Sequence, residues 1–120
     1  MTGRGYPHQN GGLARALEIV GERWTLLIIR EAMGGVSRFD DFHASLGLSR
    51  KSLSSRLNLL VDRGVMVKAA YQQRPVRFDY RLTEKGAALG PAIAALTHWG
   101  TAHGAAQART RATGAAGGRC

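Results

Sequence analysis

Residues 48–66, LSRKSLSSRLNLLVDRGVM, decide the fold and raise the main functional question. At 100° per residue, Leu53, Leu57 and Leu60 gather on one side, which is the apolar stripe of an amphipathic helix. The preceding serine is a good N-cap, and the helix is predicted over residues 49–63. The opposite side is polar and consists of Lys51, Ser54, Ser55, Asn58 and Asp62, with Arg50 and Arg56 at its edges.

The polar side of this helix has the donors that reading the major groove of DNA requires. Arg and Lys pair with guanine O6 and N7, Asn pairs with adenine, and Ser contacts bases or phosphates. The alternative is an ordinary solvated face, but such faces usually pair Glu with Lys at i, i+4. Here the one acid, Asp62, lies at the far C-terminal end. The residues expected to contact DNA are Ser49, Arg50, Lys51, Ser54, Ser55 and Asn58.

The segments on both sides of this helix predict a winged helix-turn-helix. Residues 39–46 read as a short helix that a glycine ends. After the long helix, apolar residues alternate over 65–71 and again over 76–82 around a polar loop, which predicts an antiparallel hairpin. Two short helices joined by a tight turn and followed by a hairpin are the winged-helix pattern.

The predicted hairpin has a basic edge. Arg74 lies in its loop and Arg77 follows, so both can grip phosphates or enter the minor groove. The alternative is a hairpin tip that only increases solubility. Alternation places Val76, Phe78 and Tyr80 on one side, and Arg77, Asp79 and Arg81 on the other.

The whole chain predicts a mainly α-helical fold with this small hairpin as its β-structure, an α+β class. Helices are expected over 13–20 and 22–33, a brief strand at 36–38, and a last helix that Thr83 caps and Pro91 kinks or restarts. We expect a flexible N-terminus at 1–11, a DNA-binding and dimerisation domain at 12–104 and a disordered basic tail at 105–120.

The charge balance favours a polyanionic partner. The chain has 120 residues, with 17 Lys+Arg against 8 Asp+Glu and a formal net charge of +9. Residues 49–81 hold eight basic and two acidic side chains, so six of those nine charges lie there. Such a field attracts nucleic acid or an anionic membrane surface. No apolar run approaches the roughly 20 residues of a membrane span, and without an apolar signal core we expect a cytoplasmic protein and no membrane partner.

Enzyme and metal chemistry find no support in the sequence. The four histidines are scattered, and His98 and His103 are five residues apart, not the four that put two ligands on one helix face. The single cysteine, Cys120, cannot form an intrachain disulfide or a zinc cluster. No Ser/His/Asp set and no GxGxxG spacing is recognisable. We therefore expect no catalytic activity, no metal and no cofactor.

Three blocks of the sequence resemble the HxlR-type transcriptional regulators, a branch of the MarR-like winged-helix proteins. The first is LARALEIVGERWTLLIIREAMGGVSRFDDF (13–42), and the second is the segment quoted above, residues 48–66. The third is RFDYRLTEKGAAL (77–89), followed by Pro91, Leu96 and the pair Trp99-Gly100. The resemblance covers residues 11–100 and implies a homodimer that pairs through its first and last helices. It also implies a palindromic operator near a promoter, a recognition helix over 49–63, and wing contacts from Arg74 and Arg77.

One departure from the family pattern concerns sensing. Many members carry a cysteine just before the first helix, in a pattern like Cys-x-x-Ala-Arg, which in some of them senses oxidants, quinones or aldehydes. Here Gly11 takes that position in GGLAR. A glycine has no thiolate to react, so a noncovalent small-molecule effector is the expected route. The aromatic residues expected to line such a pocket are Trp24, Phe39, Tyr71 and Trp99. For the two tryptophans, the alternative is core and dimer packing.

The sequence thus predicts a homodimeric regulator, a repressor, that binds double-stranded DNA. The residues expected to pack across the twofold axis are Leu13, Leu17, Leu89, Ile93, Leu96 and Trp99. One alternative is a small-molecule-binding or protein-interaction module that uses the fold without reading DNA sequence. Another is an RNA-binding protein, but RNA readers usually present aromatics on an exposed sheet face, and the aromatics of this hairpin are expected to be buried.

Overall fold

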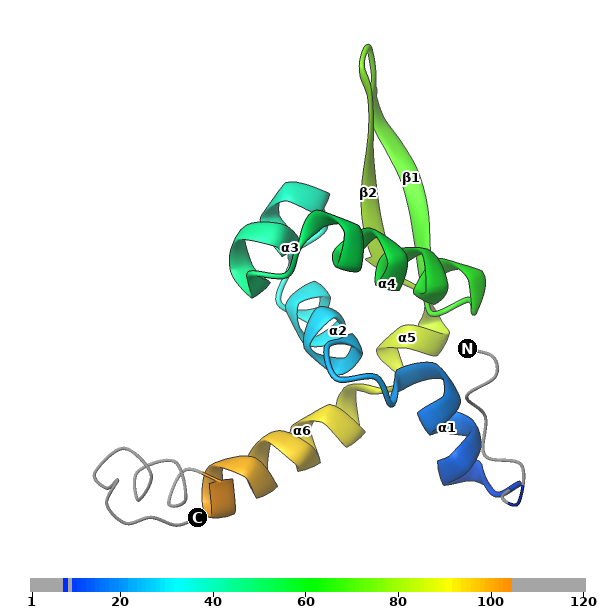
Figure 1. The fold of residues 1–120 in the computed structure, drawn as a ribbon, viewed down its shortest axis with the longest axis vertical. Helices are drawn as coiled ribbons and strands as arrows, with labels where there is room; N and C mark the ends of the chain where they lie inside the picture. Colours follow the sequence, from blue (N-terminus) through cyan, green and yellow to red (C-terminus); the bar gives the residue numbers. More distant parts are fainter. Residues whose placement is uncertain (1–7, 9, 105–120) are drawn as a thin grey trace. The chain divides into compact units, whose positions relative to one another are not determined.

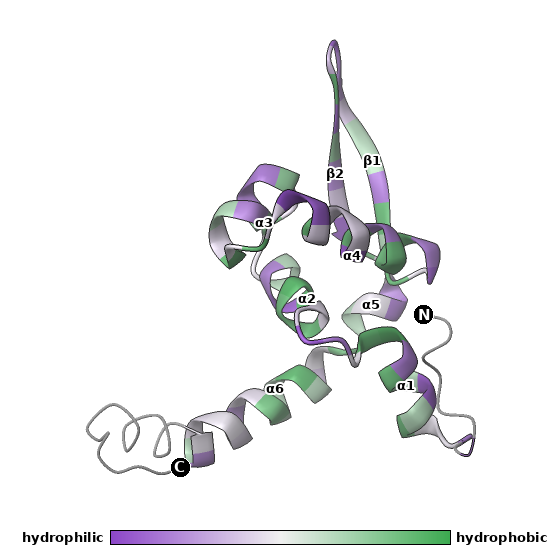
Figure 2. Ribbon diagram, viewed as in Figure 1, coloured by the Kyte–Doolittle hydropathy of each residue, from purple (hydrophilic) through white to green (hydrophobic). Residues whose placement is uncertain are grey.

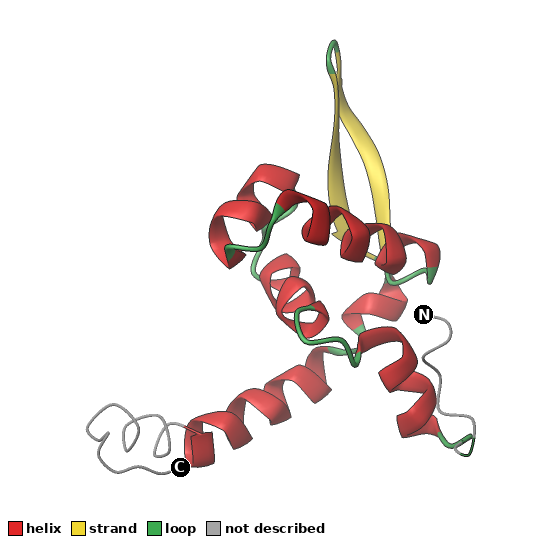
Figure 3. Ribbon diagram, viewed as in Figure 1, coloured by secondary structure: helices red, strands yellow, loops and turns green. Residues whose placement is uncertain are grey.

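The computed structural model describes residue 8 and residues 10–104, and it confirms the predicted winged-helix architecture (Figures 1 and 3). The chain consists of two compact units, with the boundary between Ala88 and Leu89. The predicted tail at 105–120 lies outside the described residues, as does most of the predicted N-terminus at 1–11. The first unit holds α1 (Gly12–Val20), α2 (Thr25–Met33), α3 (Phe39–Leu46), α4 (Arg50–Asp62), β1 (Met66–Gln73), β2 (Val76–Leu82) and α5 (Glu84–Ala87). The second unit holds α6 (Gly90–Trp99) and a π-helical turn, η2 (Gly100–Gly104).

Local chemistry sets the ends of the helices as predicted. The Ser49 hydroxyl accepts a hydrogen bond of 3.0 Å from the Ser52 amide and caps α4. Thr83 caps α5 in the same way, through the Gly86 amide at 3.1 Å. Gly47 ends α3 with a φ of 73°, a left-handed conformation that favours glycine.

Two element boundaries differ from prediction. Residues 36–38 form no strand, but Arg38 makes one isolated bridge to Asp79. The second helix begins at Thr25 because the Glu22 carboxylate accepts a hydrogen bond of 2.8 Å from the Trp24 amide and holds the preceding residues in a turn. By contrast, the last helix restarts at Pro91 as predicted: it is divided into α5 and α6, and Pro91 lies in the first turn of α6, where its missing N–H costs nothing.

The core of the first unit lies between α2, α3, α4 and the base of the hairpin. Ile28 and Ile29 of α2 and Phe42 of α3 are fully buried. Leu53, Leu57 and Leu60 of α4 are also fully buried, which confirms the predicted apolar stripe. Figure 2 shows hydrophobic and hydrophilic residues alternating along α4. This packing fixes the rotation of α4 about its own axis, and so determines which side chains it presents to solvent.

The hairpin pairs β1 with β2 in antiparallel register, from Met66 opposite Leu82 to Gln73 opposite Val76. The register shifts between Ala70 and Gln72, so Tyr71 is an extra residue in β1. Strand β1 continues to Gln73, two residues further than predicted, whereas β2 has the predicted bounds. Only Arg74 and Pro75, joined by a cis peptide bond, form the loop.

Two expectations about the faces of the hairpin are wrong. Alternation predicts Asp79 on the solvent side, but it is only 7% exposed. It is buried because Ser37 and Arg38 run beside β2, where the Ser37 carbonyl accepts a 2.7 Å hydrogen bond from the Tyr80 amide. Val76, which alternation predicts on the same face as the buried Tyr80, is 52% exposed because it lies next to the loop, beyond the reach of the core.

In the second unit, the apolar side chains of α6 differ in how far they are buried. Ile93 is buried, whereas Leu96 and Trp99 are 54% and 62% exposed. The ring of Trp99 lies 5.2 Å from that of His103 in η2. Within the part of the chain that the structure describes, no helix is long and apolar enough to cross a bilayer. Nor does any group of three or more His, Cys, Asp or Glu side chains in that part have the geometry to hold a metal ion.

Candidate nucleic-acid interface

The outer face of α4 presents polar side chains to solvent. Lys51, Ser55 and Asn58 are exposed, and Ser54 is half-buried. The structure divides the predicted contact set between two sides of the helix. Ser54 lines a cavity on the hairpin side, and Ser55 and Asn58 line one on the α1 side. At 100° per residue, Lys51 lies between Asn58 and Ser55. Ser49 remains exposed, but its hydroxyl already serves as the N-cap.

Two clefts flank α4. The first, here called the wing cleft, is a cavity of about 490 Å³ between α3, α4 and the hairpin. It is lined by Arg38, Phe39, Asp40, Asp41, Ser54, Tyr71, Val76, Arg77, Phe78 and Tyr80. The second, here called the α1 cleft, measures about 850 Å³. It is lined by Leu17, Glu18, Ile19, Gly21, Glu22, Ser55, Arg56, Asn58, Leu59 and Asp62.

Arg50, the first residue of α4, is exposed but paired. Its guanidinium donates a hydrogen bond of 2.8 Å to Asp40 Oδ1 in the first turn of α3 and lies 5.8 Å from the centre of the Phe39 ring. This contact holds the pKa of the Asp40 carboxyl below its usual value, with a smaller contribution from the charge of Arg77. Sequence reasoning placed Asp40 in that first turn but missed this pair, because no local pattern links residues on different helices.

Arg56 does not flank the polar surface as expected. Its guanidinium donates a 2.5 Å hydrogen bond to Glu22 Oε2 and a second one to the Ser52 carbonyl at 3.2 Å. The hydrogen bond from Arg56 is the main reason that the pKa of Glu22 falls from 4.5 to about 2. The same bond raises the pKa of Arg56. Arg56 therefore fastens α4 to the turn before α2, and its charge is neutralised there.

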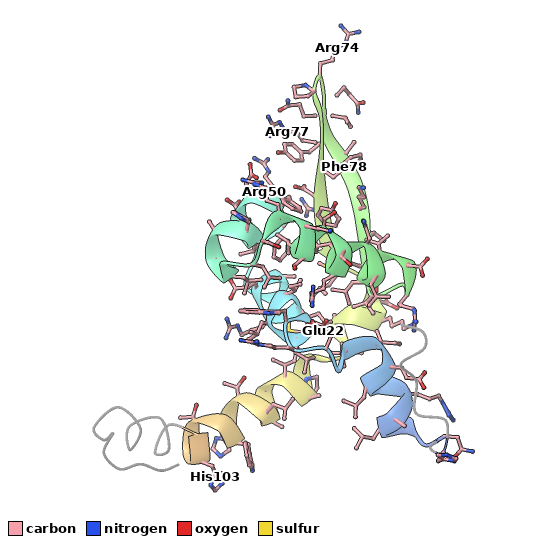
Figure 4. All side chains as sticks on the ribbon, viewed as in Figure 1. Glu22, Arg50, Arg74, Arg77, Phe78 and His103 are labelled. Carbon is pink, nitrogen blue, oxygen red and sulfur yellow. The ribbon has the colours of Figure 1, made fainter. Side chains whose placement is uncertain are left out.

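The hairpin carries cations at its tip and along one edge. Figure 4 shows Arg74 at the tip and Arg77 on the side toward Arg50. Among the described residues, no ion pair involves Arg74 or Arg77. By contrast, Arg81 donates a 2.8 Å hydrogen bond to Asp79. Arg74 and Arg77 are thus the hairpin arginines that no ion pair among the described residues neutralises, and their contact with DNA stays a prediction.

A second basic side chain near the hairpin is already engaged. The Arg38 guanidinium lies 4.0 Å from the centre of the Tyr71 ring and 3.6 Å from Asp79 Oδ1. Sequence reasoning missed Arg38 as well, because its partners are distant in sequence. Arg81, Arg38 and the Ser37 hydroxyl together lower the pKa of Asp79, with Arg81 contributing most. This network anchors the base of the hairpin to the segment before α3.

The predicted effector residues are not all brought together. Phe39 and Tyr71 line the wing cleft. Trp24 lines neither of the two clefts, and its ring contacts Arg23 at 5.2 Å. Trp99 belongs to the second unit.

The model of the HxlR-like helix-turn-helix family matches residues 19–108. The chain belongs to this family. Among similar proteins, an uncharacterized HTH-type transcriptional regulator of Mycobacterium tuberculosis is 52% identical over 88 residues, covering 73% of this chain and 56% of the relative. The chain thus spans about half the length of such mycobacterial relatives. The HTH-type transcriptional regulator YodB of Bacillus subtilis is 33% identical over 85 residues, covering 70% of this chain and 76% of YodB.

Solved structures agree with the HxlR-like assignment. The structure of PA1607 is 40% identical, with a TM-score of 0.74, and the match covers 80% of this chain and 67% of that one. The reduced form of YodB is 30% identical with a TM-score of 0.66, covering 77% and 91%. The reduced form of the redox regulator HypR is 25% identical with a TM-score of 0.72, covering 77% and 92%. The chain therefore has the helix-turn-helix fold of a family of transcriptional regulators.

Proposed function

We propose that this protein is a sequence-specific regulator of transcription, a repressor, that binds double-stranded DNA as a homodimer. The observation that carries the proposal is the outer face of α4, where Lys51, Ser55 and Asn58 are exposed. Beside it, Arg74 and Arg77 of the hairpin form no ion pair with any residue that the structure describes. The α4 helix enters the major groove, which is wide enough to admit a helix and displays a distinct pattern for each base pair.

Affinity and sequence choice come from different parts of this surface. Phosphate neutralisation by cations such as Arg74 and Arg77 supplies affinity that is independent of sequence and decreases with salt. Lys51 and Asn58 supply choice, because Lys pairs with guanine and Asn with adenine at the base edges. The hairpin reaches the phosphates or the minor groove next to the major groove that α4 occupies.

Exposed apolar side chains support the homodimer. Leu13 and Leu17 of α1 are 74% and 37% exposed, and Leu96 and Trp99 of α6 are similarly uncovered. Large exposed apolar patches usually mark a protein interface. Leu89 is half-buried and Ile93 is buried, so these two predicted interface residues offer less surface to a partner. A twofold dimer places two copies of α4 about 34–36 Å apart, one turn of DNA.

A noncovalent effector fits the wing cleft better than the four-aromatic pocket predicted from sequence. Phe39 and Tyr71 line this cleft together with Ser54 and Arg77. A planar ligand in this cleft would lie on the side of α4 that carries Ser54. It would therefore oppose DNA binding directly, because both ligands need the same surface.

Selection from a randomised duplex library tests the function. The dimer should enrich an inverted repeat with half-sites about 10–10.5 base pairs apart, or a multiple of that spacing. Gel shifts on the enriched site should survive a large excess of random DNA, and a promoter carrying the site should be repressed. Absence of any enriched sequence, with binding abolished by random DNA, would contradict the proposal. It would favour a module that uses the fold without reading sequence.

A further inference from the structure

A carboxylate lies in the middle of the cationic surface proposed to contact DNA. Asp40 forms the 2.8 Å pair with Arg50 at the N-terminus of α4, and it lines the wing cleft together with Ser54 and Arg77. Figure 4 shows Arg50 and Arg77 on the same side of the hairpin. Any phosphate or base that reaches Arg50 must therefore displace Asp40 or lie next to it.

The Asp40–Arg50 pair contributes little to the stability of the fold. The two side chains are 65% and 61% exposed, and exposed ion pairs are weakened by solvent and salt. A role in holding α3 against α4 is therefore a poor explanation for it, since both helices bury apolar side chains in the core, Phe42 from α3 and the leucines from α4. The pair instead affects how readily Arg50 can bind DNA.

Competition for Arg50 affects different DNA sites unequally. If the Arg50 guanidinium leaves Asp40 for a phosphate, it only exchanges one anionic partner for another. The Asp40 carboxylate, now without its partner, then repels the phosphates. If the Arg50 guanidinium instead leaves Asp40 for a guanine base, it gains two parallel hydrogen bonds, to O6 and N7. Discrimination of this kind needs a penalty on the wrong partner as well as contacts to the right one.

We propose that Asp40 is a specificity-determining residue that occupies Arg50 as an internal substitute for phosphate and thereby weakens binding to DNA of arbitrary sequence. The proposal rests on the proposed function, because it requires that α4 contacts DNA. Asp40 acts through Arg50 and touches no base itself. Asp41 provides a matched control, since it lies in the same helical turn, is exposed and lines the same cleft, but does not pair with Arg50.

The test compares Asp40→Asn with Asp41→Asn on a random 30-base-pair duplex and on the selected site, over a series of salt concentrations. Asp40→Asn should tighten binding to the random duplex by about three- to tenfold and steepen the salt slope by about one unit, because one more cation becomes available to phosphates. Binding to the selected site should change less, so the specificity ratio falls. Asp41→Asn should change the ratio by less than about twofold, and Asp40→Asn should gain nothing in an Arg50→Ala background.

Three results would overturn the proposal. Equal gains from Asp40→Asn and Asp41→Asn would show only a general effect of net charge. Weaker binding by Asp40→Asn would mean that Asp40 holds Arg50 ready for DNA. A gain that persists without Arg50 would break the link between the two residues. A wild-type protein that binds neither duplex would instead contradict the proposed function itself, and this inference with it.

Discussion

At the scale of single residues, Arg56 shows how one helix divides its cations between folding and binding. It lies one residue after Ser55, but its guanidinium is turned to Glu22 and the Ser52 carbonyl. Its Nε atom is buried without a hydrogen-bond partner among the described residues, which usually costs about 1–3 kcal/mol. The Glu22–Arg56 pair is therefore expected to influence stability rather than DNA recognition.

Glu22→Gln should destabilise the protein at neutral pH by about 1 kcal/mol, since its partly exposed pair is screened by solvent. The pKa of Glu22 is about 2 in the folded state, below its ordinary 4.5. The stabilisation is therefore complete above about pH 4.5 and is lost as the pH falls toward 2. Urea unfolding between pH 7 and pH 2 should show a smaller pH dependence in the variant than in the wild type.

Glu84→Gln is the control for this prediction, because Glu84 is an exposed glutamate in the first turn of α5. It should leave the pH dependence between 4.5 and 2 close to that of the wild type. Superimposable acid profiles for Glu22→Gln and the wild type would show that the pair with Arg56 has no effect on folding.

The sequence predicted residues whose role is local and missed those whose partners are distant. Ser49, Thr83 and Gly47 act within three or four positions of themselves, so a short pattern identifies them. Glu22 and Arg56 are 34 positions apart and come together only after α2 and α4 have packed. The same is true of Arg38 and Asp79, which explains why alternation wrongly places Asp79 on the solvent side.

At the scale of elements, periodicity was sufficient to predict α4 and the hairpin. The apolar period of α4 identifies its buried side, and therefore its outer side, from the sequence alone. The alternation in the hairpin predicted its two strands but not its loop length or its bulge at Tyr71, because these depend on pairing geometry. The division of the contact set between the wing cleft and the α1 cleft also depended on tertiary packing.

Arg77→Ala should weaken binding to all DNA sequences alike, because the proposed contacts of the hairpin are to phosphates. The slope of log Kd against log salt should become shallower by about one unit. Gel shifts at several salt concentrations measure it. Arg23→Ala, which removes an arginine outside α4 and the hairpin, is the control and should keep the wild-type slope. An unchanged slope for Arg77→Ala would place the hairpin outside the DNA interface.

At the scale of the whole molecule, the proposed function requires two copies of the chain. The family and the mainly α-helical winged fold followed from the sequence because three blocks occur in the right order and spacing. Subunit pairing could be predicted only from exposed apolar residues and from the family resemblance. The burial of Ile93 was not predicted, since an apolar helix period does not distinguish a side chain buried within one chain from one buried between chains.

Leu96→Glu should convert dimers into monomers, because it places a charge where an apolar side chain would be covered by the partner. The fold should survive, since Leu96 is 54% exposed in the single chain. Size-exclusion chromatography with light scattering measures the change. Ala94→Glu, two residues earlier and thus on nearly the opposite side of α6, is the control and should remain dimeric. If the Leu96→Glu variant remained dimeric, the subunit interface would not include Leu96.

The central claim is that the outer face of α4 reads bases in the major groove. The direct measurement is the affinity for every single-base variant of the selected site, compared between the wild type and the variants Lys51→Ala and Asn58→Ala. Each variant should lose about 1–3 kcal/mol of discrimination at one or two base pairs and keep the preferences at the others. If both variants lower affinity by the same factor at every base pair, these side chains contact phosphates and α4 is not the element that reads sequence.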